Sequence, residues 1–241
     1  MAGINIIVQN ADFSETATRW AADVPDGLVY ANFFTSSDVL ARNLVSGGDA
    51  ATVVGTPTIS SNWMTVTHGS NYIQTPAPQT ADFTWLVVTR QQAESTGHII
   101  GNYIDGVTSQ GTLYWAEGAG GDSKVNLSFS TSIFNNPTIS PNVQTTALRD
   151  VPTGPQAISA RYNSATALKT VNMLTLALAY TNTPAYPMPT PGTTNIRLGQ
   201  GQTGSTEIAA ALIWNTVLSD VDLAAAYAQV KAFMASKSIT V

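Results

Sequence analysis

Carboxylate pairs are the first groups in this 241-residue sequence that could carry out chemistry. Two-carboxylate hydrolysis needs two acids that face each other across a bond, roughly 5–9.5 Å apart. Three groupings stand out: Asp23 with Asp26, Glu117 with Asp122, and Asp220 with Asp222. The first flanks a Val-Pro turn, the second bounds a glycine-rich loop, and the third stands where a helix is expected to begin. We therefore expect structural roles for all three.

Nucleophilic and metal chemistry has few candidate residues. The chain has no cysteine and two histidines, His68 and His98, each beside a glycine in an expected loop. No Gly-x-Ser-x-Gly elbow is present, although a triad assembled from distant segments stays open. Two lone histidines without cysteine do not make a zinc site. We predict no metal and no cofactor, with a weak calcium site at Asp122 and Glu117, or at Asp105, as the alternative.

The segment Gly199–Gly204 spells G-x-G-x-x-G, the pattern of a nucleotide-binding loop. That loop binds phosphates only where a helix of βαβ spacing follows it, and no such helix is expected here. We interpret the segment as a flexible hairpin connection.

Composition excludes several classes of partner. Charged residues make up 10% of the chain, and 10 basic against 15 acidic residues give a net charge of −5. No basic cluster exists that could neutralise phosphates, so we expect no nucleic-acid binding. No apolar run reaches the ~18 residues of a membrane span, and we expect no membrane partner. The first residues lack a basic segment followed by a long apolar one, so no secretory signal is expected.

Short alternating segments separated by turn residues predict an all-β fold. The strongest candidate is Phe83–Thr89, with Phe83, Trp85 and Val87 on one face. Leu113–Trp115 and Val125–Phe129 are expected to form a hairpin across the glycine-rich loop. The other strand candidates are Ile4–Val8, Ala51–Val54, Trp63–Thr67, Ala157–Tyr162, Lys169–Leu174, Ile196–Gly199 and Ile208–Trp214.

One helix is expected near the C-terminus. Ser219 is a good N-cap, and Asp220 and Asp222 suit the positive end of the helix dipole. Helical spacing then places four residues on one face: Leu223, Tyr227, Val230 and Met234. Residues Ile239–Val241 are expected to form a short terminal strand.

The chain is expected to form one domain over residues 21–241, preceded by an N-terminal arm or anchoring segment over residues 1–20. The proline-rich stretch Thr183–Gly192 is short and contains Tyr186 and Met188. We interpret it as an ordered, extended loop rather than a linker, since too little chain follows it to fold alone.

The order of several weak motifs resembles the concanavalin A-like lectin/glucanase superfamily, in its laminin-G or pentraxin-like branch, over roughly residues 28–235. The motifs are Asp82–Trp85, Ile99–Asn102, Gly111–Tyr114, Ile158–Tyr162, Asn195–Gly199, and the ending Ile208–Trp214 followed by a turn into Leu218–Asp220. The resemblance implies a two-sheet antiparallel jelly-roll sandwich with one C-terminal α-helix. Glucanases of this superfamily carry a Glu-x-Asp-x-Glu strand motif, which this chain lacks.

Lectin sites pair an aromatic platform with polar side chains, and this chemistry suggests a ligand site. Trp115 stands beside the glycine-rich loop, with core packing as its alternative role, whereas Trp63, Trp85 and Trp214 are expected in the core. The predicted ligand-binding residues are Trp115, Glu117, Asp122, Tyr103 and Asn102.

Taken together, these features predict a non-catalytic structural module of a virion or surface that binds a partner protein or a cell-surface glycan. The compact size, missing signal and Thr/Ser/Asn-rich surface look like structural proteins of tailed phages, which implies synthesis in a host cytoplasm and a place in the virion. Nearly uncharged strands predict a homo-oligomer with the N-terminal arm contributing contacts, and the phage resemblance implies a trimer. The alternative is a polysaccharide-degrading enzyme with an unrecognised carboxylate pair.

Overall fold

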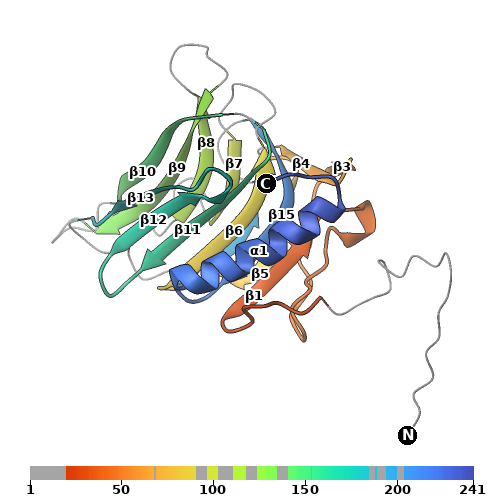
Figure 1. Ribbon diagram of the computed structural model, residues 1–241, viewed down its shortest axis with the longest axis horizontal. Coiled ribbons are helices and arrows are strands. Elements are labelled where there is room, and N and C mark those ends of the chain that lie inside the picture. Colours follow the sequence, from red (N-terminus) through yellow and green to blue (C-terminus); the bar gives the residue numbers. More distant parts are fainter. Residues whose placement is uncertain are drawn as a thin grey trace, which may run out of the picture.

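The computed structural model describes residues 20–67, 69–90, 97–102, 111–117, 124–134, 141–152, 154–184, 188, 194–199 and 204–241. Within them the chain forms a sandwich of two antiparallel sheets, with one α-helix lying across the outside of one sheet (Figure 1). The predicted fold class is therefore confirmed.

The first sheet has eight strands. In spatial order they are β13 (Leu178–Asn182), β12 (Leu168–Met173), β11 (Gln156–Asn163), β6 (Phe83–Arg90), β15 (Ser205–Trp214), β4 (Trp63–Thr67) and β3 (Thr58–Ser60), with β1 (Leu28–Phe33) also pairing with β15.

The second sheet has seven strands. In spatial order they are β10 (Pro141–Pro152), β9 (Lys124–Phe134), β8 (Gly111–Glu117), β7 (Gly97–Gly101), β14 (Asn195–Leu198), β5 (Tyr72–Pro78) and β2 (Thr52–Val54). The remaining elements are two 3₁₀ turns, η1 (Ser37–Val39) and η2 (Leu174–Leu176), and the helix α1 (Asp220–Ser236).

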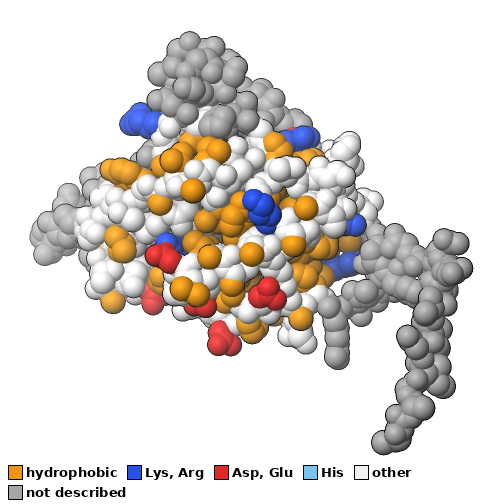
Figure 2. All heavy atoms as spheres, viewed as in Figure 1, with side chains coloured by type: hydrophobic (Ala, Val, Ile, Leu, Met, Phe, Trp, Pro, Cys, Tyr) orange, Lys and Arg blue, Asp and Glu red, His pale blue; other side chains and the backbone are white. Residues whose placement is uncertain are grey.

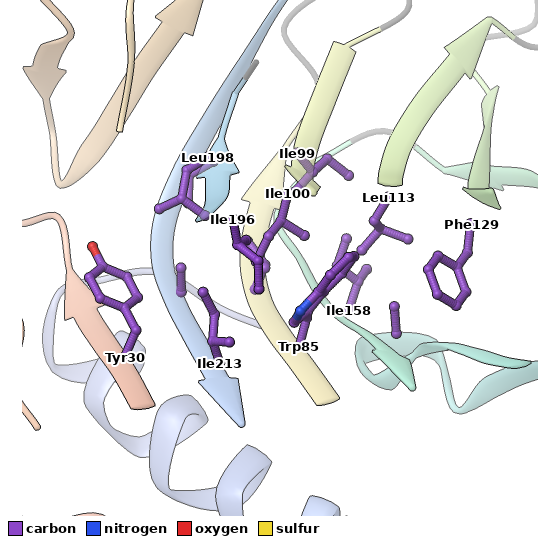
Figure 3. Close-up of a cluster of buried hydrophobic side chains, with 14 of the residues drawn as sticks. Tyr30, Trp85, Ile99, Ile100, Leu113, Phe129, Ile158, Ile196, Leu198 and Ile213 are labelled. Carbon is purple, nitrogen blue, oxygen red and sulfur yellow. The ribbon is translucent and has the colours of Figure 1, made fainter. Parts of the chain in front are cut away.

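The main core lies between the two sheets (Figure 3). Strand β6 contributes Phe83, Trp85 and Val87 from its inner face, as the alternation predicted, and all three are fully buried. The Trp85 ring meets Phe129 of the opposite sheet edge to face, with centroids 5.9 Å apart. Aromatic packing of this kind adds to the burial energy that holds the sheets together.

A second core lies on the outer face of the eight-stranded sheet, under α1. Leu86 and Val88 of β6 point to this side, so β6 is apolar on both faces. Helix α1 packs Leu223, Val230 and Met234 onto it. We name the outer face of β6, β15 and β1 beneath α1 the covered half, and the outer face of β11, β12 and β13 the open half.

The start of α1 agrees with the sequence. The Ser219 hydroxyl accepts a hydrogen bond from the Asp222 backbone N–H at 3.1 Å and donates to the Asp222 carboxylate at 2.7 Å. These bonds satisfy an otherwise unpaired donor of the first turn. The buried face contains Ala226 as well as the predicted residues, while Tyr227 is only partly buried.

Two expectations about the C-terminal part were wrong. Residues Ile239–Val241 form no strand; instead Ile239 and Val241 are buried in the core beneath α1. The segment Gly199–Gly204 is no hairpin connection, because it joins β14 of the seven-stranded sheet to β15 of the eight-stranded sheet. The chain crosses from one layer to the other there.

Several strands were not predicted, and for two of them the local reason is visible. Strand β5 contains Pro76 and Pro78, residues that usually argue against a strand. Strand β1 contains Asn32, which is fully buried and donates a hydrogen bond to the Val39 carbonyl at 2.8 Å. A buried polar residue interrupts the apolar pattern by which strands are recognised.

Among the described residues, no helix is long and apolar enough to cross a membrane. The expected strand Ile4–Val8 and residues 1–19 of the expected N-terminal arm lie outside the described residues. Trp20, the last residue of that arm, packs edge to face against Phe33.

Candidate functional site

The open half carries a groove of about 480 Å³. Side chains alternate across a strand, so the residues of β11, β12 and β13 that do not enter the core line up on this outer face. The groove is lined by Arg161, Asn163, Leu168, Thr170, Asn172, Ala179, Thr181, Val217 and Asp220. Figure 2 shows this side of the molecule, where charged side chains are scattered thinly among polar and apolar ones.

Strand register arranges these side chains in rows across the sheet. Arg161 pairs with Thr170, and Thr170 pairs with Thr181 on the next strand. A second row joins Asn172 to Ala179. Hydroxyl, amide and guanidinium groups therefore repeat at the spacing of neighbouring strands, about 4.7–4.9 Å.

The turn between β11 and β12 fixes one end of the groove. The Asn163 side chain accepts a hydrogen bond from the Thr166 backbone N–H at 3.2 Å. The Asp82 carboxylate accepts bonds of 2.7 Å from both the backbone N–H and the hydroxyl of Ser164. These bonds tie the turn to the start of β6 and fix the position of Asn163 at the groove.

Arg161 is the cation of the groove lining, and the protein holds it firmly. One terminal nitrogen donates to the Leu218 carbonyl at 2.9 Å, and the other pairs with the Asp220 carboxylate at 2.7 Å. The Arg161 side chain is 13% exposed, whereas that of Asp220 is 90% exposed. The guanidinium is therefore a fixed group, and its carboxylate partner is a surface group.

This set of side chains can bind but lacks the parts for hydrolysis. Of the described residues that line the groove, Asp220 alone carries a carboxylate, and it is already paired with Arg161. Two-carboxylate hydrolysis needs a second acid at about 5–9.5 Å. Over the described ranges, no group of three or more His, Asp or Glu side chains could hold a metal ion.

The predicted ligand residues do not gather in this groove. Trp115 is 1% exposed and belongs to the core between the sheets, so its ring has no open face for a sugar, and the platform hypothesis is wrong. Asn102 is also 1% exposed, and its side-chain oxygen accepts a hydrogen bond from the Gly111 N–H at 2.9 Å. It stabilises the start of β8 rather than a ligand.

The other predicted residues escape a structural test. Tyr103 and Asp122 lie outside the described residues, as do His68 and Asp105 of the alternative sites, and only the backbone of Glu117 is described, in β8. Asp23 lies in a bend, and its backbone N–H donates a hydrogen bond to the Gln229 side-chain oxygen of α1 at 3.0 Å. That contact agrees with a structural role for the segment.

The expectation for His98 was wrong. It lies in β7 rather than in a loop, is 9% exposed, and stacks on Tyr114 with centroids 5.4 Å apart. The neighbouring glycine suggested a loop, but Gly97 instead permits a close approach: a Cβ there would come within 2.8 Å of the Ser205 carbonyl oxygen.

Arg161 and its row were missed as site residues, although the sequence carried a signal. In Ile158–Tyr162 the apolar residues alternate with Ser159 and Arg161, which places an arginine on a polar strand face. The partner could not be read in the same way. Asp220 was correctly placed at the helix start, but its contact with Arg161 joins segments 59 positions apart in sequence, as their numbers show.

No protein-family profile and no curated protein matches the sequence. Among solved structures, the chain is similar to the receptor-binding domain of botulinum neurotoxin type G, with a TM-score of 0.60 and 8% identity over 85% of this chain and 52% of that one. It is also similar to the binding domain of botulinum neurotoxin DC in complex with SialylT, with a TM-score of 0.58 and 11% identity over 83% and 51% of the two chains.

A third similar structure is described as "Cell entry of botulinum neurotoxin type C is dependent upon interaction with two ganglioside molecules", with a TM-score of 0.61 and 9% identity over 84% and 51% of the two chains. This chain spans about half the length of these structures. At such low identity the likeness shows the fold alone, a β-sandwich of the kind found in receptor-binding domains.

Proposed function

We propose that this chain is a non-catalytic glycan-binding module whose ligand lies in the groove of the open half. One observation carries the proposal: beside α1 the outer sheet face forms a groove lined by hydroxyl, amide and guanidinium groups around Arg161. Thr181 is exposed in this groove, whereas Thr170 and Asn172 are each 7% exposed. Polyhydroxylated ligands are recognised by such convergent donors and acceptors, set in a concave surface.

The similar structures support the ligand class. One of them is a toxin binding domain in complex with SialylT, and for another toxin cell entry depends on interaction with two ganglioside molecules. Those partners were found for toxin domains of which the match covers only 51%. For this chain, the groove itself supports the ligand class.

We expect the binding to be weak for a single sugar. Among the described residues no aromatic side chain lines the groove, so we expect recognition to depend on hydrogen bonds that replace those made to water. A dissociation constant on the order of 0.1–1 mM, equivalent to roughly 4–5.5 kcal/mol, is the expected range.

A groove-filling variant tests the proposal. Ala179 is exposed in the groove on strand β13, and tryptophan there should block the ligand without removing a core contact. Val221, which is 79% exposed at the start of α1 and is not among the groove-lining residues, provides the control Val221→Trp. Binding should be screened on a glycan array and quantified by titration calorimetry.

The proposal predicts that Ala179→Trp abolishes binding, that Val221→Trp binds like the parent chain, and that both variants melt within a few degrees of it. Equal binding by Ala179→Trp and the parent chain would remove the groove from consideration.

The alternative function is an enzyme that degrades polysaccharide. The single, ion-paired carboxylate of the groove favours binding. Reducing-sugar release from any polysaccharide that the chain binds should stay at the level of a no-protein blank. Turnover that Asp220→Asn abolishes would instead indicate an enzyme.

We also retain, on the sequence resemblance, the proposals that the chain is a virion structural protein and that it forms a homo-oligomer, most plausibly a trimer. Strand β13 supports self-association, since it is an edge strand without charge and exposes Leu178 at 44% and Tyr180 at 49%. Uncharged edges of this kind pair readily with other chains. Light scattering at tens of micromolar, on the full chain and on a chain lacking residues 1–20, tests this: a monomer in both cases contradicts it.

A further inference from the structure

The ion pair in the groove is unequal, and the inequality points to a ligand class. Arg161 is held at 2.9 Å by the Leu218 carbonyl and is largely buried, so its position does not depend on Asp220 alone. The Asp220 carboxylate, 2.7 Å from the guanidinium, is 90% exposed. A surface carboxylate can turn into water at little cost, whereas the guanidinium stays where it is.

A displaced Asp220 would leave a fixed planar donor facing the groove. A guanidinium matches a carboxylate in a two-pronged arrangement, and such charge-assisted bonds are stronger than neutral ones. The Asp220 carboxylate already occupies the position that a ligand carboxylate would take. The protein thus contains, in its own side chain, a chemical mimic of an acidic ligand.

The rest of the row has the length for a sugar that carries an acid at one end. From Arg161 through Thr170 to Thr181 the row crosses three strands, which spans about 10 Å at the usual strand spacing. Hydroxyl groups of the ligand would then meet the two threonines while its carboxylate lies on the guanidinium. The Leu168 side chain, 37% exposed in the groove, offers an apolar surface to the carbon face of a sugar ring.

Resting on the glycan-binding function above, we propose that the groove binds acidic glycans, sugars that carry a carboxylate, and that this carboxylate takes the place of Asp220 on Arg161. Asp220 is then a built-in competitor that sets the affinity. The net charge of −5 disfavours every anion at long range, but salt screens such repulsion beyond about 8 Å.

Titration calorimetry with a matched pair of ligands tests the inference. Sialyllactose carries the carboxylate, lactose lacks it, and a sulfated lactose shows whether any anion suffices. The full chain is compared with Arg161→Gln, Arg161→Lys and Asp220→Asn, and with Asp49→Asn, which removes the same charge at an exposed position outside the groove.

The parent chain should prefer sialyllactose to lactose and to sulfated lactose by about tenfold or more. Asp220→Asn should tighten sialyllactose binding about two- to fivefold and leave lactose unchanged, while Asp49→Asn changes neither. Arg161→Gln should remove the preference, and Arg161→Lys should remove most of it, because lysine keeps the charge but loses the planar fork.

The failures are distinguishable. Equal affinity for sialyllactose and lactose, blocked by Ala179→Trp, overturns the acidic ligand and keeps the glycan-binding groove. Weaker sialyllactose binding by Asp220→Asn overturns displacement, since Asp220 would then be helping rather than competing. Unchanged binding by Ala179→Trp overturns the groove itself. Arg161→Lys keeps the test decisive if Arg161→Gln does not fold.

Discussion

The two halves of one sheet face have opposite surfaces. The covered half presents Leu86, Val88, Leu212 and Trp214 to α1, and all four are buried in the second core. The open half, which begins at the neighbouring strand β11 on the same face, presents Arg161 and a series of asparagines and threonines around a groove. The same backbone geometry therefore yields a packing surface or a binding surface, according to the residues at alternate positions.

The difference is visible in the strands themselves. Strand β6 reads FTWLVVTR and is buried on both faces, because a sheet covers one side and a helix the other. Strand β11 reads QAISARYN and is buried on both faces at its start, but from Ile158 on its apolar residues alternate with polar ones, and Arg161 and Asn163 are partly exposed. A continuous apolar run marks a strand between two layers, and alternation marks a strand with one exposed side.

The largest expected effect compares a leucine from each half. Leu223 of α1 packs on the covered half and is 3% exposed, and Leu223→Ala should lower the free energy of unfolding by roughly 2–5 kcal/mol, since it leaves a cavity. Leu168 is 37% exposed in the groove, and Leu168→Ala should lower the free energy of unfolding by about 1 kcal/mol or less. Urea unfolding followed by circular dichroism measures both. Equal losses would show that α1 is not docked as described.

The second prediction concerns the two faces of β12. Thr170 faces the groove, whereas Lys169 is fully buried on the core side, with its ammonium 5.7 Å from the centre of the Phe129 ring. Burial lowers the pKa of Lys169 from its ordinary 10.5 to about 8. Between these values the unfolded chain binds more protons than the folded one, so stability should rise as the pH increases from 8 toward 10.5.

Below pH 8 Lys169 is charged in both states, and its burial lowers the free energy of unfolding by about 3 kcal/mol, which corresponds to the size of the pKa change. Lys169→Met should therefore raise the free energy of unfolding at pH 7 by up to about 3 kcal/mol and flatten its rise with pH. The comparison is made from pH 8 to 9.5, because burial also raises the pKa of Tyr30 and Tyr162, whose contribution to stability falls above pH 10. An unchanged pH slope in Lys169→Met would contradict the assignment.

A smaller effect is expected where the two halves meet, at the start of α1. Ser219→Ala removes the cap that accepts from the Asp222 N–H and should cost about 1 kcal/mol. Ser219→Asn should recover most of the loss, since asparagine caps as well as serine. A loss above 2 kcal/mol, or none, would show that the cap is not what fixes this end of the helix.

The smallest effect is expected from chelation. Neither half presents a cluster of acids able to hold a cation within the described ranges. Adding EDTA should leave the melting temperature unchanged, and adding calcium should not raise it. A rise of several degrees with calcium would show a native-state metal site, because a ligand that binds only the folded chain must stabilise it.

The sequence predicted the layers better than the site. Helix α1 and strands β4, β6, β8, β9, β11, β12 and β15 followed from periodicity and capping, since those signals are local. Site prediction fails for a different reason. Trp115 was given as an aromatic platform because a loop follows it, yet its strand parity sends the ring inward, opposite Leu127 of β9.

Pairing between distant segments accounts for the remaining gap. The sequence places Asp220 at a helix start and Arg161 on a polar strand face, but only the path of α1 across the sheet brings them within 2.7 Å. Whether β11 to β13 are covered likewise depends on the path of α1 over the sheet, which no local pattern records.

Residue-resolved NMR titration of the full chain tests the central claim most directly, that the open half is the binding surface. With ¹⁵N-labelled protein and an acidic oligosaccharide raised to millimolar concentration, the account predicts that amide shifts cluster in residues 159–172 and 178–182, with the amides beneath α1 unchanged. Shifts that cluster instead on the seven-stranded sheet, for example around Tyr72 and Arg197, or no shifts with any glycan, would contradict it.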